Sequence, residues 1–309
     1  MESAMQAYSL KRLFLALLVA LVVSIVSFSL LRLTGDPAVA IAGASASPEA
    51  IEAVRVKYGL DQSLVVQYLT WLAGALRGNL GQSYFFGTPV GGVLAEYLPI
   101  TMRLGISAIL IAIGVAVPLG IVAGLKPNTW LDRIALVFAV AGQAIPSFWL
   151  ALMMIVTIGV QLRWLPTSGD GTWQHFVMPA TVLAYYAMPA LMRMTRAGMI
   201  DVMGSDYIKA ARANGLSEFS IVLKHALRNA IIPVVALAAV QFGFMLGGSI
   251  VVETVFALHG VGYLAWESIQ RADIPVVQSI VLVLAMIFVG LNFLADIMNA
   301  LLNPRLRTA

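Results

Sequence analysis

The sequence of 309 residues contains no cysteine and has few charged side chains. The absence of cysteine excludes disulfides, thiolate-bound zinc or iron-sulfur centres, and a cysteine nucleophile. Charged residues make up 11% of the chain and apolar residues 60%, whereas about a quarter of an ordinary soluble domain is charged. The mean hydropathy is +0.90. The composition therefore predicts a membrane protein and gives no sign of a nucleic-acid-binding surface.

Six apolar runs are long enough to cross a membrane, since a helical span needs about 20 such residues. They cover residues 13–33, 100–125, 134–161, 176–199, 230–252 and 277–302. The first run follows Lys11 and Arg12, as a cleaved signal peptide would, but it exceeds the about 7 to 15 apolar residues of signal peptides. We therefore expect it to stay as a transmembrane helix.

Ionisable side chains are missing from the middle of all six runs. Buried charges usually mark ion or proton pathways, so their absence argues against a proton- or sodium-coupled carrier. Paired acids, a Ser/His/Asp set and an HExxH motif are also missing at that depth, which argues against a membrane enzyme. His175, His225 and His259 fall in three different connections and predict no metal site.

Basic residues predict the orientation of the chain. If the N-terminus is cytoplasmic, the inside segments hold 12 of the 19 Lys and Arg residues and the longer outside segments hold seven. Six spans with both termini inside is the consistent topology. The outside segment 34–99 contains two predicted helices: one begins at Ser47-Pro48-Glu49 and ends near Tyr58-Gly59, and an amphipathic one follows Asp61 and runs to Leu76.

Proline and glycine occur inside several runs. Pro118, Pro146, Pro189 and Pro233 predict kinks, because neighbouring helices satisfy the carbonyls that proline frees. Two GxxxG patterns, at 120–124 and 243–247, permit close helix packing but identify no particular partner.

The connection 201–235 is basic, amphipathic and helical in pattern. Ser205 is expected to cap a helix that ends at Asn214-Gly215, and Ser217 is expected to cap a second helix. The result is a helix, a sharp turn and a helix with a protruding face of apolar and small residues. A basic helix lying on anionic lipid is the alternative, but the glycine turn breaks the continuous face that lipid binding favours.

The segment 206–217, DYIKAARANGLS, resembles the EAA loop of ATP-binding-cassette import permeases in the dipeptide, oligopeptide, glutathione and nickel branch. The resemblance extends along the whole chain, through GDP at 35–37, YGLD at 58–61, GNLG at 78–81, LPIT at 98–101, HALRNA at 225–230, GGS at 247–249, VE at 252–253 and NPR at 303–305. Lys209 stands where the general motif has glutamate, and 225–228 replaces its Ile-x-Leu-Pro. Roles of that glutamate therefore do not transfer.

The resemblance implies an all-α, six-span permease of the type I importer fold in the bacterial inner membrane, with both termini cytoplasmic. Its parts are a first helix with its leading segment (1–33), a periplasmic helical region (34–99), a permease core (100–302) with a coupling loop at 201–229, and a cytoplasmic tail (303–309). The loop residues expected to contact an ATPase are Asp206, Tyr207, Lys209, Ala210, Ala211, Arg212, Gly215 and Leu216.

The partners implied are a homologous second permease, one or two cytoplasmic ATP-binding subunits and a periplasmic substrate-binding protein that docks on parts of 34–99 and 253–275. The chain has no GxxxxGK[ST] phosphate-binding loop, so we expect another polypeptide to hydrolyse ATP, and we expect no cofactor. Peptide-type cargo, including glutathione, is the expected substrate. Nickel is the alternative within the family, and a stand-alone channel or secondary carrier is the alternative outside it.

Overall fold

The computed structural model describes residues 2–33, 35–43 and 45–302. Within these ranges the chain forms helices, and its β-structure is limited to one isolated bridge between Gln82 and Pro89. The predicted tail 303–309, with the motif residues 303–305, lies outside the described residues. The all-α prediction is confirmed.

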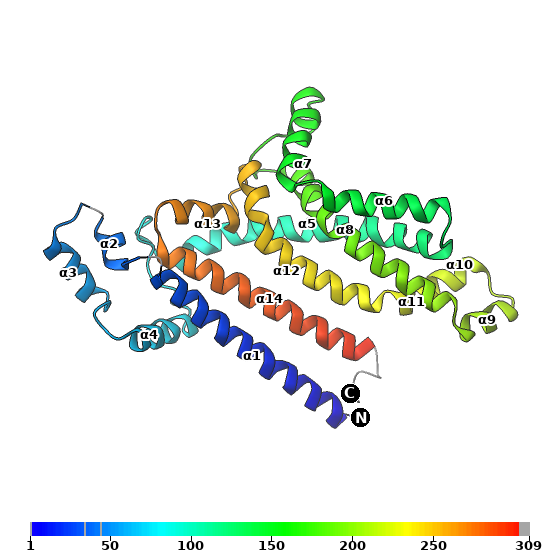
Figure 1. Ribbon diagram of the computed structural model, residues 1–309, viewed down its shortest axis with the longest axis horizontal. Coiled ribbons are helices and arrows are strands. Elements are labelled where there is room, and N and C mark those ends of the chain that lie inside the picture. Colours follow the sequence, from blue (N-terminus) through cyan, green and yellow to red (C-terminus); the bar gives the residue numbers. More distant parts are fainter. Residues whose placement is uncertain (1, 34, 44, 303–309) are drawn as a thin grey trace.

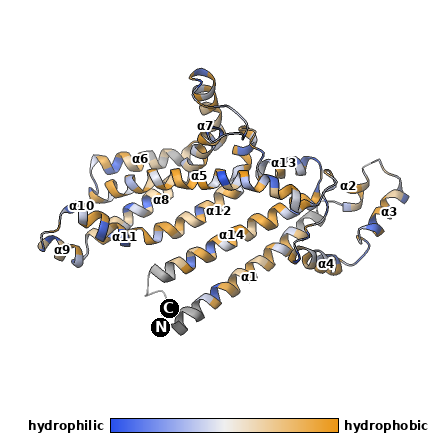
Figure 2. Ribbon diagram, turned by 180° about the vertical axis from the view of Figure 1, so that it is seen from behind, coloured by the Kyte–Doolittle hydropathy of each residue, from blue (hydrophilic) through white to orange (hydrophobic). Residues whose placement is uncertain are grey.

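Five helices in the described part are long and apolar enough to cross a membrane. They are α1 (Glu2–Leu33), α5 (Val90–Leu125), α8 (Gln174–Met203), α12 (Ile232–Val255) and α14 (Ile274–Leu302). They correspond to the first, second, fourth, fifth and sixth predicted runs, although the fifth run begins two residues before α12. Most of their residues are hydrophobic, as the colours of the ribbon show (Figure 2).

The third run does not form one continuous helix. It is divided into α6 (Trp130–Ala144), α7 (Ser147–Met154) and the wider π-helix η1 (Ile155–Gln161). The break is at Ile145 and Pro146, both of which have extended backbone angles, because proline disfavours helical geometry in the residue before it. The predicted kink at Pro146 is thus a full interruption, and α7 projects from the bundle (Figure 1).

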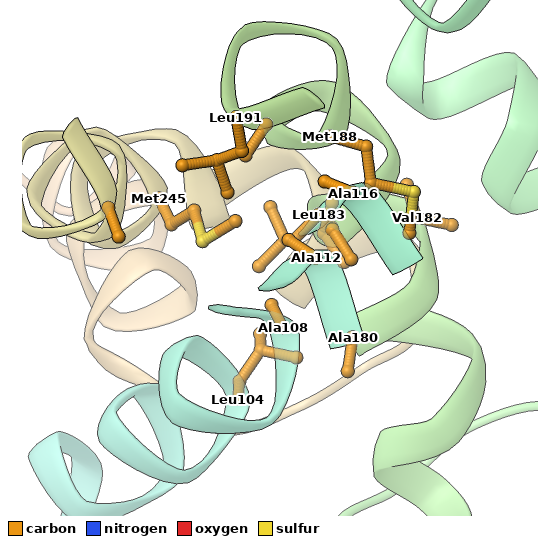
Figure 3. Close-up of a cluster of buried hydrophobic side chains, with 14 of the residues drawn as sticks. Leu104, Ala108, Ala112, Ala116, Ala180, Val182, Leu183, Met188, Leu191 and Met245 are labelled. Atoms are coloured by element: carbon orange, nitrogen blue, oxygen red, sulfur yellow. The ribbon is translucent and has the colours of Figure 1, made fainter. Parts of the chain in front are cut away.

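The centre of the bundle is the contact between α5 and α8, which run in the same direction. Alanines recur every four residues on α5, at 108, 112 and 116, and pack against larger side chains such as Leu191 and Met245 (Figure 3). Near the ends of the two helices, a Cβ on Gly120 would lie 2.6 Å from Thr195 Cβ, and one on Gly124 would lie 2.6 Å from Met199 Cβ. The first GxxxG pattern therefore serves close packing of α5 on α8.

The connection between α1 and α5 contains α2 (Pro37–Ala42), α3 (Pro48–Lys57) and α4 (Leu64–Leu76). The two predicted helices are confirmed as α3 and α4. Ser47 accepts the N–H of Ala50 at the start of α3, and Ser63 accepts the N–H of Val66 at the start of α4. Serine oxygens at this position satisfy amides that have no partner inside the helix.

The ends of the helices gather at two ends of the molecule (Figure 1). The start of α1, the end of α14, the α5–α6 junction and the segment after α8 lie toward one end. Helices α2 to α4 and α13 (Val261–Gln270) lie toward the other. An ion pair of 2.9 Å between Arg12 on α1 and Asp296 on α14 holds two of these ends together. The segments predicted to be inside thus share one end.

Candidate coupling surface

The segment between α8 and α12 folds into the predicted helix, turn and helix. It consists of α9 (Asp206–Ala213), α10 (Glu218–Ser220), the π-helix η2 (Ile221–Ala226) and α11 (Leu227–Ala230), and we call residues 204–231 the knuckle. It lies at the extreme end of the molecule (Figure 1). This position leaves its outer surface uncovered by the other described residues.

The ends of α9 follow from local chemistry. Ser205 has the extended backbone of an N-cap, but its hydroxyl donates to Val202 O instead of capping α9, so its predicted side-chain cap is absent. Gly215 has φ +78° at the other end, where the N–H of Leu216 returns to Ala211 O. A left-handed residue favours glycine. The second helix is capped as predicted, because Ser217 Oγ accepts the N–H of Ser220.

The inner face of the knuckle packs on the bundle. Ile208 on α9 and Ile221 on η2 are fully buried, together with Met199 of α8. Ala211 belongs to the same apolar cluster and is 9% exposed. The sequence predicts Ala211 on the protruding face, but the structure places it on the inner face. Helix α9 is amphipathic, and residues 208 and 211 lie on the side that faces α8.

Two polar contacts fix the shape of the knuckle. The guanidinium of Arg212 donates to both carboxylate oxygens of Glu218, at 2.7 and 3.3 Å, across the glycine turn. The hydrogen bonds from Arg212 lower the pKa of the Glu218 carboxyl below its ordinary value. Tyr207 Oη accepts a 2.8 Å hydrogen bond from Asn229 Nδ2, which joins α9 to α11. These bonds tie α9 to α10 and to α11.

The outer face carries most of the residues that the sequence singled out. Asp206, Tyr207, Lys209, Ala210, Arg212, Gly215 and Leu216 are all exposed. Among the charged ones, Lys209 pairs with Asp206 of its own helix at 2.8 Å. The outer face is therefore mixed in character, with small, apolar and paired charged side chains.

Phe219 is the prominent residue that the sequence analysis left out of the candidate site. Its side chain is 76% exposed, and Leu216 and Leu223, which are nearby in the sequence, are exposed as well. Phe219 and Leu223 are four residues apart in α10 and η2, which places them near one helical face, and Leu216 lies in the turn just before the Ser217 cap. That pattern was readable from the sequence, but an apolar stripe on a short helix is ordinarily a buried one.

A groove of about 620 Å³ lies on another part of the bundle, between α7, α8 and α12. Its lining contains polar groups from Ser147, Tyr186 and Gln241, with Phe244 and the glycines 247 and 248. None of its lining residues is charged. Gly247 has no neighbouring atom that a Cβ would meet, so the second GxxxG pattern opens partly onto this groove.

Metal ligands were not predicted, and the described part of the chain contains no group of three His, Cys, Asp or Glu side chains able to hold an ion. His259 lies 3.1 Å from Asp170 at the end opposite the knuckle.

Comparison with known families matches two regions of the chain. Residues 116–308 match the model of the binding-protein-dependent transport system inner membrane component, and residues 5–105 match the N-terminal model of such components. The chain belongs to this family. It is therefore a multi-pass inner-membrane protein and the permease subunit of an ABC transporter.

Curated relatives align over almost the full length. A putative peptide transport system permease protein of Brucella abortus (strain 2308) is 40% identical over 312 residues, which covers 98% of this chain and 99% of the relative. The glutathione transport system permease protein GsiC of Escherichia coli (strain K12) is 40% identical over 301 residues, covering 97% and 98%.

A solved structure shares the fold. One crystal form of the MetNI methionine ABC transporter in an inward-facing conformation contains a chain with a TM-score of 0.57 and 21% identity, which covers 68% of this chain and 96% of that one. The two chains therefore share a fold over this region.

Proposed function

We propose that this permease subunit imports peptide-type substrates, meaning dipeptides, oligopeptides or glutathione, across the inner membrane. The full-length relatives at 40% identity are named for peptide and glutathione transport, which supports this class over nickel. The groove between α7, α8 and α12 has an uncharged lining with a few polar groups. Such a lining suits transient passage of a peptide, since strong binding would slow release.

We further propose six crossings with both termini in the cytoplasm. The two clusters of helix ends described above support an even number of crossings. The third crossing would be made by α6 together with α7 and η1, interrupted at Pro146. The excess of basic residues near the knuckle end assigns that end to the cytoplasm.

The observation that carries the coupling proposal is the construction of the knuckle. Its base is buried against α8, and the Arg212–Glu218 and Tyr207–Asn229 contacts fix its shape, yet Leu216 and Phe219 remain exposed. A fixed apolar protrusion is suited to insertion into a cleft of another protein. We assign this surface, with the exposed loop residues named above, to contact with an ATP-binding subunit.

ATP hydrolysis is assigned to that separate subunit, since the sequence contains no phosphate-binding loop of the GxxxxGK[ST] type. Closure of the ATP-binding subunits would move the knuckle and α8 as one body and tilt the bundle. A homologous permease would complete the pathway across the groove. A substrate-binding protein would dock on parts of the end that carries α2, α3 and residues 253–275.

The coupling assignment is tested by co-purification. Phe219→Ser should reduce the amount of ATP-binding subunit recovered with the permease while leaving membrane insertion intact. Trp164→Ser is the matched control, because Trp164 is an aromatic residue with a similar exposure of 72% that lies outside the knuckle. Normal recovery with Phe219→Ser, or equal losses for both variants, would contradict the assignment.

The transport assignment is tested in vesicles that contain the assembled subunits. Uptake of a labelled dipeptide or of glutathione should need ATP and the binding protein, and should continue when an uncoupler collapses the proton gradient. Uptake that follows an imposed proton gradient without nucleotide would instead favour a secondary carrier.

A further inference from the structure

Helix α4 has an apolar face that no other part of the described chain covers. Its 13 residues include no charged side chain. Val65 is 67% exposed and Leu69 56% exposed, and Leu76 lies further along the same side of the helix. A helix of this length spans about 20 Å, which is too short to cross a bilayer.

The opposite face of α4 packs against α1. The ring of Phe28 on α1 lies 5.5 Å from the ring of Tyr68 and 5.9 Å from that of Trp71, measured between centroids. The hydroxyls of Tyr68 and Ser24 are 2.8 Å apart. Because the Ser24 hydroxyl donates a hydrogen bond to Leu21 O, Tyr68 is the donor in this pair.

These contacts fix the depth of α4 relative to the membrane. Ser24 and Phe28 both lie inside the apolar run 13–33, which is part of a helix long and apolar enough to cross a membrane. Arg32, the first charged residue after Ser24, lies eight residues further along the chain, which corresponds to about 12 Å along the helix axis. The part of α4 that touches Ser24 therefore lies below the edge of the hydrocarbon region.

The polar groups of α4 are arranged as this depth requires. The Gln67 amide donates to the backbone oxygens of Leu60 and Gln62, at 3.1 and 2.7 Å. The Tyr68 hydroxyl is satisfied by Ser24, as a polar group in hydrocarbon must be. Charged residues stand outside both ends of the helix, at Asp61 and Arg77, where the chain returns to water.

We propose that α4 is an interfacial helix embedded in the leaflet at the Phe28 end of α1, with the face of Val65, Leu69 and Leu76 in contact with lipid acyl chains. This is the outer leaflet in the predicted topology. The region 34–99 is then not wholly water-exposed: α4 belongs to the membrane, and α3 stands beyond it. The occupant of the face is lipid because α4 continues the lipid-facing surface of α1 at the same depth.

Spin labels on single cysteines test the proposal, and the chain has no native cysteine to remove. Val65→Cys and Leu69→Cys would be labelled in the complete chain, assembled with its partner subunits in lipid nanodiscs. We expect both labels to be accessible to oxygen and severalfold less accessible to a water-soluble nickel chelate than a label at Val56 on α3. A label at Val22, exposed on the α1 span, is the reference for lipid contact.

Two results would overturn the proposal. Nickel accessibility at 65 and 69 equal to that at 56 would place the face in water, and exclusion of both reagents would mean that a protein partner covers it. A fluorophore on the same cysteines gives a second reading, since lipids brominated near the glycerol should quench it. Neither measurement depends on ATP or peptide, so failure here leaves the transport assignment untouched.

Discussion

The guanidinium of Arg196 on α8 holds the carboxylate of Asp132 at the start of α6 through two hydrogen bonds of 2.6 and 2.8 Å. The Asp132 side chain is 2% exposed and also accepts the backbone N–H of Asn128 at 2.8 Å. Helix α8 continues from Arg196 to the knuckle. The α5–α6 hairpin and the knuckle are therefore attached to the same helix, close to the proposed coupling surface.

Removal of Arg196 should destabilise the protein. Arg196→Met leaves the Asp132 carboxylate buried without its counter-ion, which we expect to cost about 3 kcal/mol. Lysine at 196 should recover only part of this, because it cannot make both bonds of the guanidinium fork. Thermal unfolding of the purified protein in nanodiscs measures the effect. Arg133→Met, at an exposed neighbour of Asp132, is the control, and equal midpoints for the two methionine variants would contradict the prediction.

Glu253 has a structural role at the other end of the bundle. Its fully buried carboxylate accepts the Thr101 hydroxyl at 2.8 Å and the backbone N–H of Tyr263 at 3.0 Å, so it joins α12 to α5 and to the first turn of α13. Glu253→Gln keeps an acceptor and most of the shape, and transport should fall only modestly. Glu253→Leu leaves both donors unpaired and should cost about 2–4 kcal/mol.

Unfolding midpoints together with uptake rates test this role of Glu253. A proton-coupling role would give the reverse pattern, with Glu253→Gln folded normally but inactive even when ATP is maintained.

Adjacent alanines in α9 should respond differently to arginine. Ala210 is exposed and Ala211 is buried against Ile208 and Ile221. Ala210→Arg should leave the unfolding midpoint unchanged and reduce recovery of the ATP-binding subunit. Ala211→Arg forces a charged side chain into the apolar cluster and should cost about 3 kcal/mol. If Ala210→Arg were unstable and Ala211→Arg were not, the orientation of α9 would be wrong.

The contact between Arg212 and Glu218 should persist throughout the physiological pH range. The pKa of Glu218 is lowered from 4.5 by its hydrogen bonds to Arg212, so the stabilisation is complete above that ordinary value and is lost as the pH falls through the lowered one. Docking of the ATP-binding subunit should therefore not change between pH 6 and 8 through this group. Glu218→Gln should weaken docking at pH 7, and a wild-type affinity for this variant would contradict a positioning role.

Single cysteines also test the topology. A cysteine at Asn214 in the knuckle should react with an impermeant maleimide only in inside-out vesicles, and one at Gln62, between α3 and α4, only in right-side-out vesicles. Both residues are exposed. Reaction of both from the same side would exclude the arrangement of six crossings.

Much of this protein was determined by the sequence alone. Long apolar runs predict membrane helices because about 20 apolar residues in a helix match the thickness of the hydrocarbon core. Five of the six runs form helices of this kind in the described part of the chain. Local signals were equally direct: the serine caps of α3 and α4 and the glycine that ends α9 act within a few residues of themselves. The transporter family followed from the motif in the knuckle.

Only the tertiary structure decided which side of each element faces its neighbours. The burial of Ala211, the exposure of Phe219 and the bidentate pair of Asp132 with Arg196, 64 residues apart, depend on how separate helices meet. The depth of α4 depends likewise on its contact with Ser24 and Phe28. The composition of a segment predicts that its apolar side chains will be buried. The hydrophobic effect is not directional, so it does not specify which neighbouring helix covers them, and this is fixed only when the helices pack.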